Sequence, residues 1–587
     1  MGIQGSAGQL ASQLVNGTVE VSKGYPVGCE EAKRGSAREE AIPPRVSIPA
    51  FLAVNLLLVI GAVGCGGGGD AETSRERPSP TIVSSTTTQL PDEGCGDGRS
   101  HETAQDVPGL LWVFTCWGAD QTASVSLADL NADGVSDAIV DDPGMESGSG
   151  VVAIDGTDGS QMWRSEEAVR MITVARFADL DEDGTLDVLV GGRGVPEDER
   201  PLIAISGIDG STIWRVDPID PAWGNVFTPQ SVGDVTGDGV ADWIVATGGD
   251  HIRAAMEPPT VAGRLIAIDG ATGQLEGSVA LPEPQEIYNS PVIVADADGR
   301  SHVLVGSGGE VFPGSVWRIP VDAVLQGQAS GFEMIMSGEG QSSFIAPFSV
   351  GDLDGDGRLE VAVVRMDGRV SVLDPFGPRV LWEAQPAADD LAGMKSGSAI
   401  LSLAVPAIGQ LDEDPSLEVV TQHELVAEDD LISGSVSSTD SVLVVFDGTT
   451  GLVQHELSVR SADSVQSPLI ATTESGHGVV CACVRSDLLV DPDDAESRHA
   501  TRLGWWVPGG GDPEDLGLPA SLSITPAFSE TGATGGSHVL VSGGTYPDGG
   551  TLSRSITASR PEPAGEPIVA VEWGGYMGST STGHYDR

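Results

Sequence analysis

Acidic residues recur with one spacing in four short segments of the chain. Each segment reads D-x-[DNT]-x-D-G-x-x-[DE]. The side chains at positions one, three, five and nine are Asp129, Asn131, Asp133 and Asp137; Asp179, Asp181, Asp183 and Asp187; Asp234, Thr236, Asp238 and Asp242; and Asp352, Asp354, Asp356 and Glu360. Calcium takes about six to eight oxygen ligands, and alternate side chains of a tight loop, with the carbonyl of position seven, can converge on one ion. A glycine at position six permits the sharp turn that this needs. The spacing therefore predicts a calcium site in each of the four loops.

The flanking residues separate these loops from a helical calcium motif with a similar sequence. An EF-hand needs flanking helices and a glutamate at position twelve, whereas position twelve here is a valine, such as Val140, in an apolar strand. Further copies of the loop are weaker. Gln410 replaces the first aspartate and Pro415 the glycine in one copy, and Asp296 and Asp298 stand in a shortened version. No metal is predicted at these weaker copies.

An apolar strand precedes and follows each loop, and this unit repeats along the chain. About eight copies, from VSLADLNADGVSDAIV (125–140) to TPAFSETGATGGSHVLV (525–541), follow one another at intervals of roughly 50 to 60 residues. A second phrase, made of a strand, an Asp/Gly turn and another strand, follows most copies, as in AIDGTDGSQMW (153–163). Four strands per repeat are typical of a propeller blade. We therefore predict an all-β fold, a β-propeller of about eight (seven possible) four-stranded blades spanning residues 109–580.

The strand pattern also predicts how the blades join. Trp163, Trp214 and Trp382 end the second phrase and are expected to pack flat between neighbouring blades, because burying such a ring gives a large hydrophobic gain. The strand at residues 110–114 has no repeat of its own, and we expect it to close the ring by joining the last blade.

Blade topology predicts two different faces. In an up-and-down blade the acidic loops and the Asp/Gly turns share one side, and the loops between second and third strands lie on the other. The second–third loops include the long segments 248–263 and 422–438, and loops on a rigid scaffold are where recognition usually resides. We expect a partner to dock on this face, with Leu425, Leu431 and Leu488 as exposed apolar residues.

The acidic phrase resembles the FG-GAP repeat of integrin-α-type propellers, which also occurs in bacterial VCBS-type proteins. The second phrase resembles the blade motif of quinoprotein dehydrogenases and of their non-enzymatic scaffold relatives. Together the two resemblances cover nearly all of residues 120–575, and they imply a calcium-binding propeller that serves adhesion, ligand binding or protein binding. A quinoprotein dehydrogenase is expected to carry an adjacent pair of cysteines over its cofactor. This chain has Cys481-Ala482-Cys483 instead, which speaks against quinone binding.

Residues 1–65 are expected to form a leader. The apolar run VSIPAFLAVNLLLVIGAV (46–63) follows Arg45 and ends in Gly64-Cys65, and a positive flank, a short apolar core and a small-residue cleavage point are typical of a secretory signal. A cysteine at the cleavage point resembles the bacterial lipoprotein signal and predicts lipidation of Cys65; the alternative is a simple membrane-anchoring helix. The Gly-, Ser-, Thr- and Pro-rich residues 66–108 indicate a flexible linker. Both alternatives predict an extracytoplasmic protein, either a membrane-anchored lipoprotein or one on the cell surface.

Export permits disulfides. A bond between Cys95 and Cys116 would close a loop of about 20 residues and contribute roughly 3 kcal/mol in the chain-entropy model. Cys481 and Cys483 lie two apart on an expected strand, and three pairings remain open for them: with each other, with Cys116, or none.

The charge balance restricts the partners. The chain has 86 acidic and 30 basic residues and a net charge of −56, which repels phosphate backbones and argues against nucleic acid as a partner. The sequence contains no H-E-x-x-H motif and no Gly-rich loop ending in Gly-Lys-Ser/Thr, and its nine histidines are scattered singly. The leading hypothesis is a non-catalytic calcium-binding propeller whose ligand is an unknown protein or glycan and which meets the membrane only through a lipid anchor. The alternatives are an exported propeller enzyme, of quinoprotein or polysaccharide-cleaving type, and an envelope scaffold lipoprotein.

Overall fold

The computed structural model describes residues 109–116, 124–142, 150–165, 173–192, 202–216, 225–249, 262–309, 312–338, 342–377, 379–386, 398–412, 414–427, 440–460, 466–485, 501–520, 525–529, 538–548, 551–578 and 584–585. The predicted leader (1–65), the linker (66–108) and the lipidation site Cys65 lie outside these residues. So do Cys95 and the side chain of Cys116. Within the described ranges, none of the helices has the length and apolar character needed to cross a membrane.

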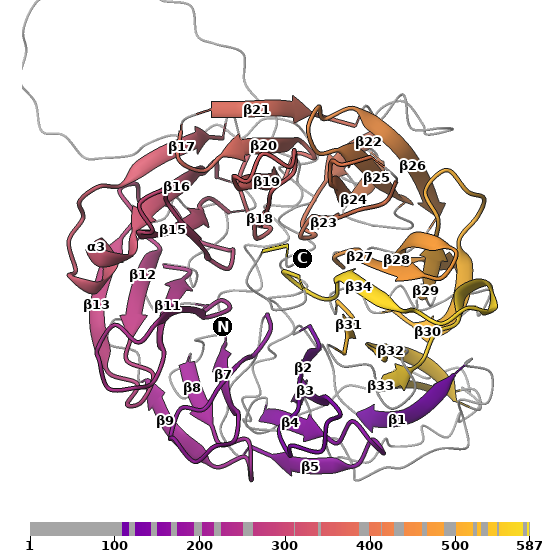
Figure 1. Cartoon of the computed structure of the whole chain (residues 1–587), viewed down its shortest axis with the longest axis horizontal. Coiled ribbons are helices and arrows are strands. Elements are labelled where there is room, and N and C mark those ends of the chain that lie inside the picture. Colours follow the sequence, from indigo (N-terminus) through magenta and orange to yellow (C-terminus); the bar gives the residue numbers. More distant parts are fainter. Residues whose placement is uncertain are drawn as a thin grey trace, which may run out of the picture.

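Eight antiparallel sheets stand around one axis, which confirms the predicted propeller (Figure 1). Blade 1 contains β2 (Ser126–Ala128), β3 (Asp137–Asp142), β4 (Gly150–Ile154) and β5 (Gln161–Arg164). Blade 2 contains β6 (Arg176–Ala178), β7 (Asp187–Gly191), β8 (Leu202–Ile205) and β9 (Thr212–Val216). Blade 3 contains β10 (Gln230–Gly233), β11 (Asp242–Thr247), β12 (Arg264–Ile268) and β13 (Leu275–Ala280). Blade 4 contains β14 (Val292–Ala295), β15 (Ser301–Gly306), β16 (Ser315–Pro320) and β17 (Glu333–Ser337), with the short helix α3 (Val321–Leu325) between the last two.

The remaining blades follow in chain order. Blade 5 contains β18 (Ser349–Gly351), β19 (Glu360–Val364), β20 (Val370–Asp374) and β21 (Arg379–Ala384). Blade 6 contains β22 (Ser398–Leu401), β23 (Ala407–Gly409), β24 (Glu418–Ala427), β25 (Asp440–Asp447) and β26 (Val453–Arg460), and β22 and β23 pair with different parts of β24. Blade 7 contains β27 (Leu469–Thr473), β28 (Gly476–Arg485), β29 (Thr501–Trp506) and β30 (Glu514–Pro519). Blade 8 contains β31 (Ala527–Phe528), β32 (Leu540–Asp548), β33 (Thr551–Ser559) and β1 (Leu110–Cys116). The 3-10 helix η1 (Pro563–Gly565) and β34 (Ala570–Trp573) follow blade 8.

The N-terminal strand closes the ring. β1 pairs antiparallel with β33, from Leu110 opposite Ser559 to Cys116 opposite Arg554, and forms the outermost strand of blade 8. The prediction that residues 110–114 join the last blade is confirmed.

Tryptophans at the outer strands of four blades lock each of these blades onto the next. Trp163 of blade 1 packs over the Asp/Gly turn of blade 2, where a Cβ on Gly210 would come within 2.7 Å of its ring. Its Nε1 donates a 2.7 Å hydrogen bond to the carbonyl of Gly207 in that turn. Trp214 and Trp382 make the same contact with the following blades, as predicted.

Trp112 of β1 repeats this contact between blades 8 and 1, donating to the carbonyl of Gly156 at 2.8 Å. Blade 3 departs from the pattern, because Gly277 occupies the position of the tryptophan. A Cβ there would lie 2.1 Å from the carbonyl oxygen of Val324 in α3. This short helix stands where blade 4 would have its Asp/Gly turn, so the tryptophan and the turn it would meet are lost together.

The C-terminal residues turn back into the ring. β34 adds to the inner edge of β27, with Trp573 opposite Ile470 (Figure 1). The Gly574 carbonyl accepts a hydrogen bond from the Phe528 amide in blade 8, and the Tyr585 amide donates to the Val350 carbonyl in blade 5. The inner strands of blades 5, 6 and 8 are buried throughout, whereas those of blades 1 and 2 are largely half-buried.

Candidate metal centres and the axial channel

The four predicted calcium loops share one backbone course. The glycine at position six has a positive φ in each, 87° at Gly134 and 91° at Gly184. A Cβ on either glycine would meet nothing within 4 Å, so the requirement is conformational rather than one of space. Position four is left-handed as well, which the sequence analysis did not foresee. Ala132 and Glu182 adopt it there with φ of 58° and 61°.

Backbone amides within each loop hold some of its carboxylate oxygens in place. In blade 2, Asp179 Oδ2 accepts from the Gly184 amide at 3.0 Å, and Asp181 Oδ1 accepts from the Asp183 amide at 3.1 Å. Asp183 Oδ1 accepts from the Thr185 amide at 2.8 Å. The same three contacts recur in blade 5. The loops are therefore closed by their own backbone, and other carboxylate oxygens remain available.

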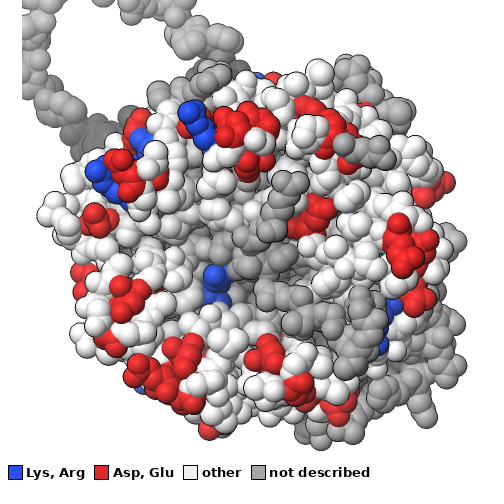
Figure 2. Space-filling model, in the orientation of Figure 1, with Lys and Arg blue, Asp and Glu red and all other residues white. Residues whose placement is uncertain are grey.

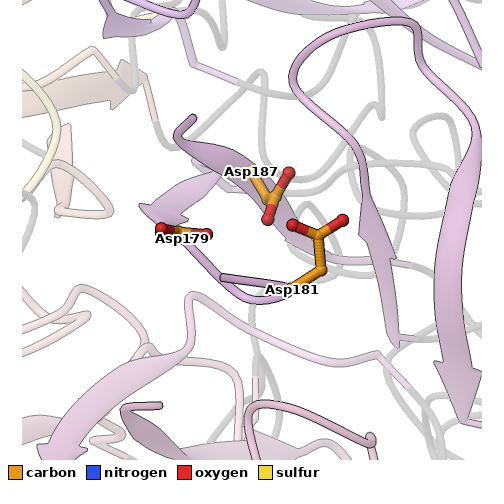
Figure 3. Close-up of side chains that lie close together, drawn as sticks. All are labelled: Asp179, Asp181 and Asp187. Atoms are coloured by element: carbon orange, nitrogen blue, oxygen red, sulfur yellow. The ribbon is translucent and has the colours of Figure 1, made fainter. Parts of the chain in front are cut away.

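Two of the predicted sites bring three carboxylates together. Oxygens of Asp179, Asp181 and Asp187 lie within 4.8 Å of one another (Figure 3), and in blade 5 the same holds for Asp352, Asp354 and Asp356. Asp179 Oδ1 and Asp352 Oδ1 are buried and have no hydrogen-bond partner. A buried carboxylate oxygen without a hydrogen-bond partner is desolvated and uncompensated, which costs free energy. A bound cation would compensate this cost in both loops.

In the loops of blades 1 and 3, Oδ1 of the position-one aspartate does have a hydrogen-bond partner. Asp129 Oδ1 accepts from the Asp133 amide at 3.1 Å, and Asp234 Oδ1 accepts from the Gly237 amide at 2.6 Å. No three acids in these two loops, all of whose residues are described, converge as those of blade 2 do. Asn131 and Thr236, predicted as ligands, also carry no charge.

Blade 6 holds a third group that the sequence analysis set aside. Oxygens of Asp412, Asp414 and Glu418 lie within 4.8 Å of one another. Glu418 is fully buried and its Oε1 has no hydrogen-bond partner. Burial raises the pKa of Glu418 to about 8, and repulsion from Asp412 adds to the shift. Gln410 replaces the first aspartate by folding over the loop, where its Nε2 donates to the carbonyls of Asp414 and Ser416.

The acid at position nine links the loop to the Asp/Gly turn of its own blade. Asp137 Oδ2 accepts from the Leu130 amide at 3.0 Å, and its Oδ1 accepts from the Gly156 amide at 2.9 Å. Asp187 and Asp242 bind the amides of Gly207 and Gly270 in the same way. Burial raises the pKa of Asp137 to about 6, while the two backbone donors oppose the shift. These bonds place the acidic loops and the turns on one face, as predicted.

Position nine is a glutamate in blades 5 and 6, and in both blades the turn no longer donates an amide to this acid. The turn residue that would face Glu360 is Pro375, which has no amide hydrogen, and the Gly448 amide in blade 6 donates to the Leu417 carbonyl instead. Glu360 therefore binds only the Leu353 amide in its loop, at 2.9 Å. Burial raises the pKa of Glu360 to about 7.

Acidic side chains form separate groups around the ring on the face shown in Figure 2, where lysine and arginine are few. A cavity of about 350 Å³ lies between the loops of blades 1 and 2, lined by Asp129, Asn131, Leu186 and Ile208 among others. Ile208 is 60% exposed. This face therefore combines carboxylates with single exposed apolar residues.

The expectation that residues 422–438 form a loop with Leu425 exposed is wrong in part. Residues 422–427 belong to β24 rather than to a loop, and Leu425 is buried at 3% exposure because it packs in the core cluster around blades 5 and 6. Leu431 and Leu488 lie outside the described residues, as do 250–261 and 428–439 within the predicted docking loops.

Two further polar groups lie in the core. Cys481 and Cys483 form a disulfide with each other, which decides among the three pairings left open. His423, fully buried, contacts Ser402 Oγ through Nδ1 and Thr421 Oγ1 through Nε2, the latter at 2.6 Å. Burial lowers the pKa of His423 to about 3, so the imidazole is neutral in the folded protein.

Comparison with known proteins gives a likeness of fold. No protein-family model matches the chain, and no curated protein matches it. The structure is similar to quinohemoprotein alcohol dehydrogenase ADHIIG from Pseudomonas putida HK5, with 12% identity, a TM-score of 0.49, and 78% of this chain and 77% of that chain covered. It is also similar to a europium-containing methanol dehydrogenase, with 10% identity, a TM-score of 0.49 and coverage of 78% and 94%. A third similar structure is the biofilm matrix protein Bap1 of V. cholerae, with 12% identity, a TM-score of 0.46 and coverage of 82% and 96%. At these identities and TM-scores the likenesses carry no conclusion about activity.

Proposed function

We propose that this chain is a non-catalytic, calcium-stabilised β-propeller of the FG-GAP or VCBS kind, working outside the cytoplasm in adhesion or ligand binding. One observation carries the calcium part. The two predicted loops in which three carboxylates converge are the two whose position-one aspartate keeps a buried oxygen without a hydrogen-bond partner, Asp179 Oδ1 and Asp352 Oδ1. A bound calcium ion would supply both the missing partner and the countercharge.

By the same criterion, the acidic loops are not equally suited to bind calcium. Blades 2 and 5 are the first candidates, and blade 6 follows because Glu418 Oε1 is free in its acid group. Blades 1 and 3 would have to break a bond between Asp129 or Asp234 and the loop backbone before that oxygen could turn to an ion. We therefore expect two or three tightly held ions rather than the four that the spacing alone predicts.

Metal analysis after dialysis tests this distribution. Asp179→Asn and Asp352→Asn should each reduce the bound calcium by about one ion per chain. The matched control, Asp129→Asn, changes the same position of the same motif and should leave the tightly bound calcium unchanged. A calcium-free wild type, or an equal loss in all three variants, would contradict the proposal.

The long loops favour ligand binding as the function. The loops between second and third strands include the long segments 248–263 and 428–439. Loops on a rigid scaffold are where recognition usually resides. We infer that a protein or glycan ligand docks on those loops, and that a lipid at Cys65 holds the propeller at a membrane.

Loop trimming tests the docking face. Because 422–427 is strand, the deletion should be confined to 428–439, together with 250–261 in blade 3. Folding should survive, since loop length alters stability only slowly, and binding to a ligand found by glycan and envelope-protein screens should be lost. Full binding by the trimmed protein would move the site to the acidic-loop face.

A further inference from the structure

The C-terminal residues make contacts that blade closure does not require. Ring closure is complete once β1 pairs with β33. Yet residues 570–578 and 584–585 contact five of the blades, through Ile293 in blade 4, Val350 in blade 5, Gln410 in blade 6, Ile470 in blade 7 and Phe528 in blade 8.

One carboxylate joins the parts of this segment. Glu572 Oε2 accepts from the Gln410 amide at 2.7 Å and from the Tyr585 hydroxyl at 2.9 Å. Its Oε1 lies 3.2 Å from His477 Nδ1. Glu572 thus ties blade 6, blade 7 and the end of the segment to one point, and its side chain is only 16% exposed.

The end of the segment reaches the far side of the ring, at the inner strands of blades 4 and 5. The Tyr585 amide donates to the Val350 carbonyl at 2.8 Å, and His584 pairs with Val350 as a parallel bridge. His584 Nε2 lies 2.6 Å from the Ile293 carbonyl. The inner edges of β14 and β18 therefore receive partners that depend on where Tyr585 is held.

Apolar packing fixes the middle of the segment. Trp573 and Met577 are fully buried, and Tyr576 and Tyr585 pack against the same cluster as the inner strands of blades 4 to 7. Burying such side chains stabilises the docked segment through the hydrophobic effect, so apolar packing holds the segment as well as its polar contacts.

We propose that residues 570–578 and 584–585 form a latch that closes the propeller a second time, from inside, and covers the inner strand edges of blades 5 and 7, with Glu572 as the residue that couples its two ends. An uncovered edge presents unpaired backbone groups to any other extended chain, and the latch satisfies them within the molecule. This role does not involve the proposed docking face, but two of the latch contacts, at Val350 and Gln410, adjoin the acidic loops of blades 5 and 6.

Hydrogen–deuterium exchange of the full-length protein tests the coupling. Glu572→Gln removes the charge that holds Tyr585, and Tyr585→Phe removes only the hydroxyl while keeping the buried ring. Both variants should speed exchange in 570–573, and also in 292–295 and 348–351 on the far side, by roughly tenfold (about 1.4 kcal/mol). Exchange in 551–559, which pairs with β1, should stay unchanged.

Glu566→Gln is the matched control. Glu566 accepts from the Ser475 amide and hydroxyl in blade 7 and precedes the latch, so its loss should leave exchange on the far side as in the wild type. Faster exchange confined to 570–573 would reduce the segment to local packing and overturn the coupling. Equal effects of Glu566→Gln and Glu572→Gln would overturn it as well. Wild type and variants are compared in the same chelated buffer, where no calcium is bound, so failure of the calcium proposal would not be mistaken for failure of the latch.

Discussion

Trp163 and Asp187 belong to different blades and are joined through a single residue, Gly207. The indole of Trp163 donates to the carbonyl of Gly207, and the amide of Gly207 donates to Asp187 at 3.1 Å. Trp112, Gly156 and Asp137 repeat the arrangement, as do Trp214, Gly270 and Asp242. The acidic loops of blades 1, 2 and 3 are thereby tied to the tryptophan of the preceding blade, so in these blades inter-blade packing and loop geometry are parts of one hydrogen-bonded unit.

Trp163→Phe should isolate the contribution of this bond. The ring stays and the hydrogen bond is lost, which leaves the buried Gly207 carbonyl without its donor and should reduce the free energy of unfolding by about 1–3 kcal/mol. Trp243→Phe is the control, because the buried Nε1 of Trp243 has no hydrogen-bond acceptor. It should cost clearly less in the same urea titration. Equal losses would show that ring volume, not the bond, is what matters.

Substitutions of Asp187 and Asp181 should distinguish a structural contribution to stability from a contribution made through bound calcium. Asp187→Ala leaves the Leu180 and Gly207 amides unsatisfied, each costing about 1–3 kcal/mol, and should destabilise the protein even with a chelator present. Asp181 is exposed and holds only the Asp183 amide. Asp181→Ala should therefore lower the melting temperature mainly when calcium is present, because native-state ligand binding adds RT ln(1 + [L]/Kd). Identical behaviour of the two variants in chelator would refute this division.

His423 should make the fold sensitive to acid. Its folded pKa of about 3 lies below the usual 6.5, so the unfolded chain takes up the proton first. Stability from this group is complete above pH 6.5 and falls as the pH drops below it. The loss should reach roughly 2 kcal/mol at pH 5. The stability difference between wild type and His423→Gln should shrink by that amount between pH 7.5 and pH 5. A difference independent of pH would contradict the assignment.

Cys65→Ser should release the chain from membranes or stall its processing. The expectation rests on the apolar run that ends at Cys65 and on the glycine-rich residues after it. Fractionation of cells and mass spectrometry of the mature N-terminus would show the effect. Unchanged membrane retention with normal cleavage would contradict lipidation and favour another mode of attachment.

The sequence predicted the blades because strand periodicity, turn residues and tryptophans all recur in one frame. It could not distinguish Asp179 from Asp129, since both are position-one aspartates and only the folded loop decides whether Oδ1 meets a backbone amide. The latch was out of reach because residues 570–585 resemble no repeat and their partners, such as Gln410, lie far away in sequence. Leu425 was misplaced because β24 continues beyond the ordinary length of a blade strand.

The place where the chain enters blade 8 determines where the predicted linker joins the propeller. Gly109 accepts a hydrogen bond from the Arg560 amide, so β1 starts beside the end of β33, on the acidic-loop side and at the outer rim (Figure 1). A tether through residues 66–108 would therefore pull on one corner of the disc. The long-loop face lies on the opposite side of blade 8 and is left clear of the point where the chain enters the propeller.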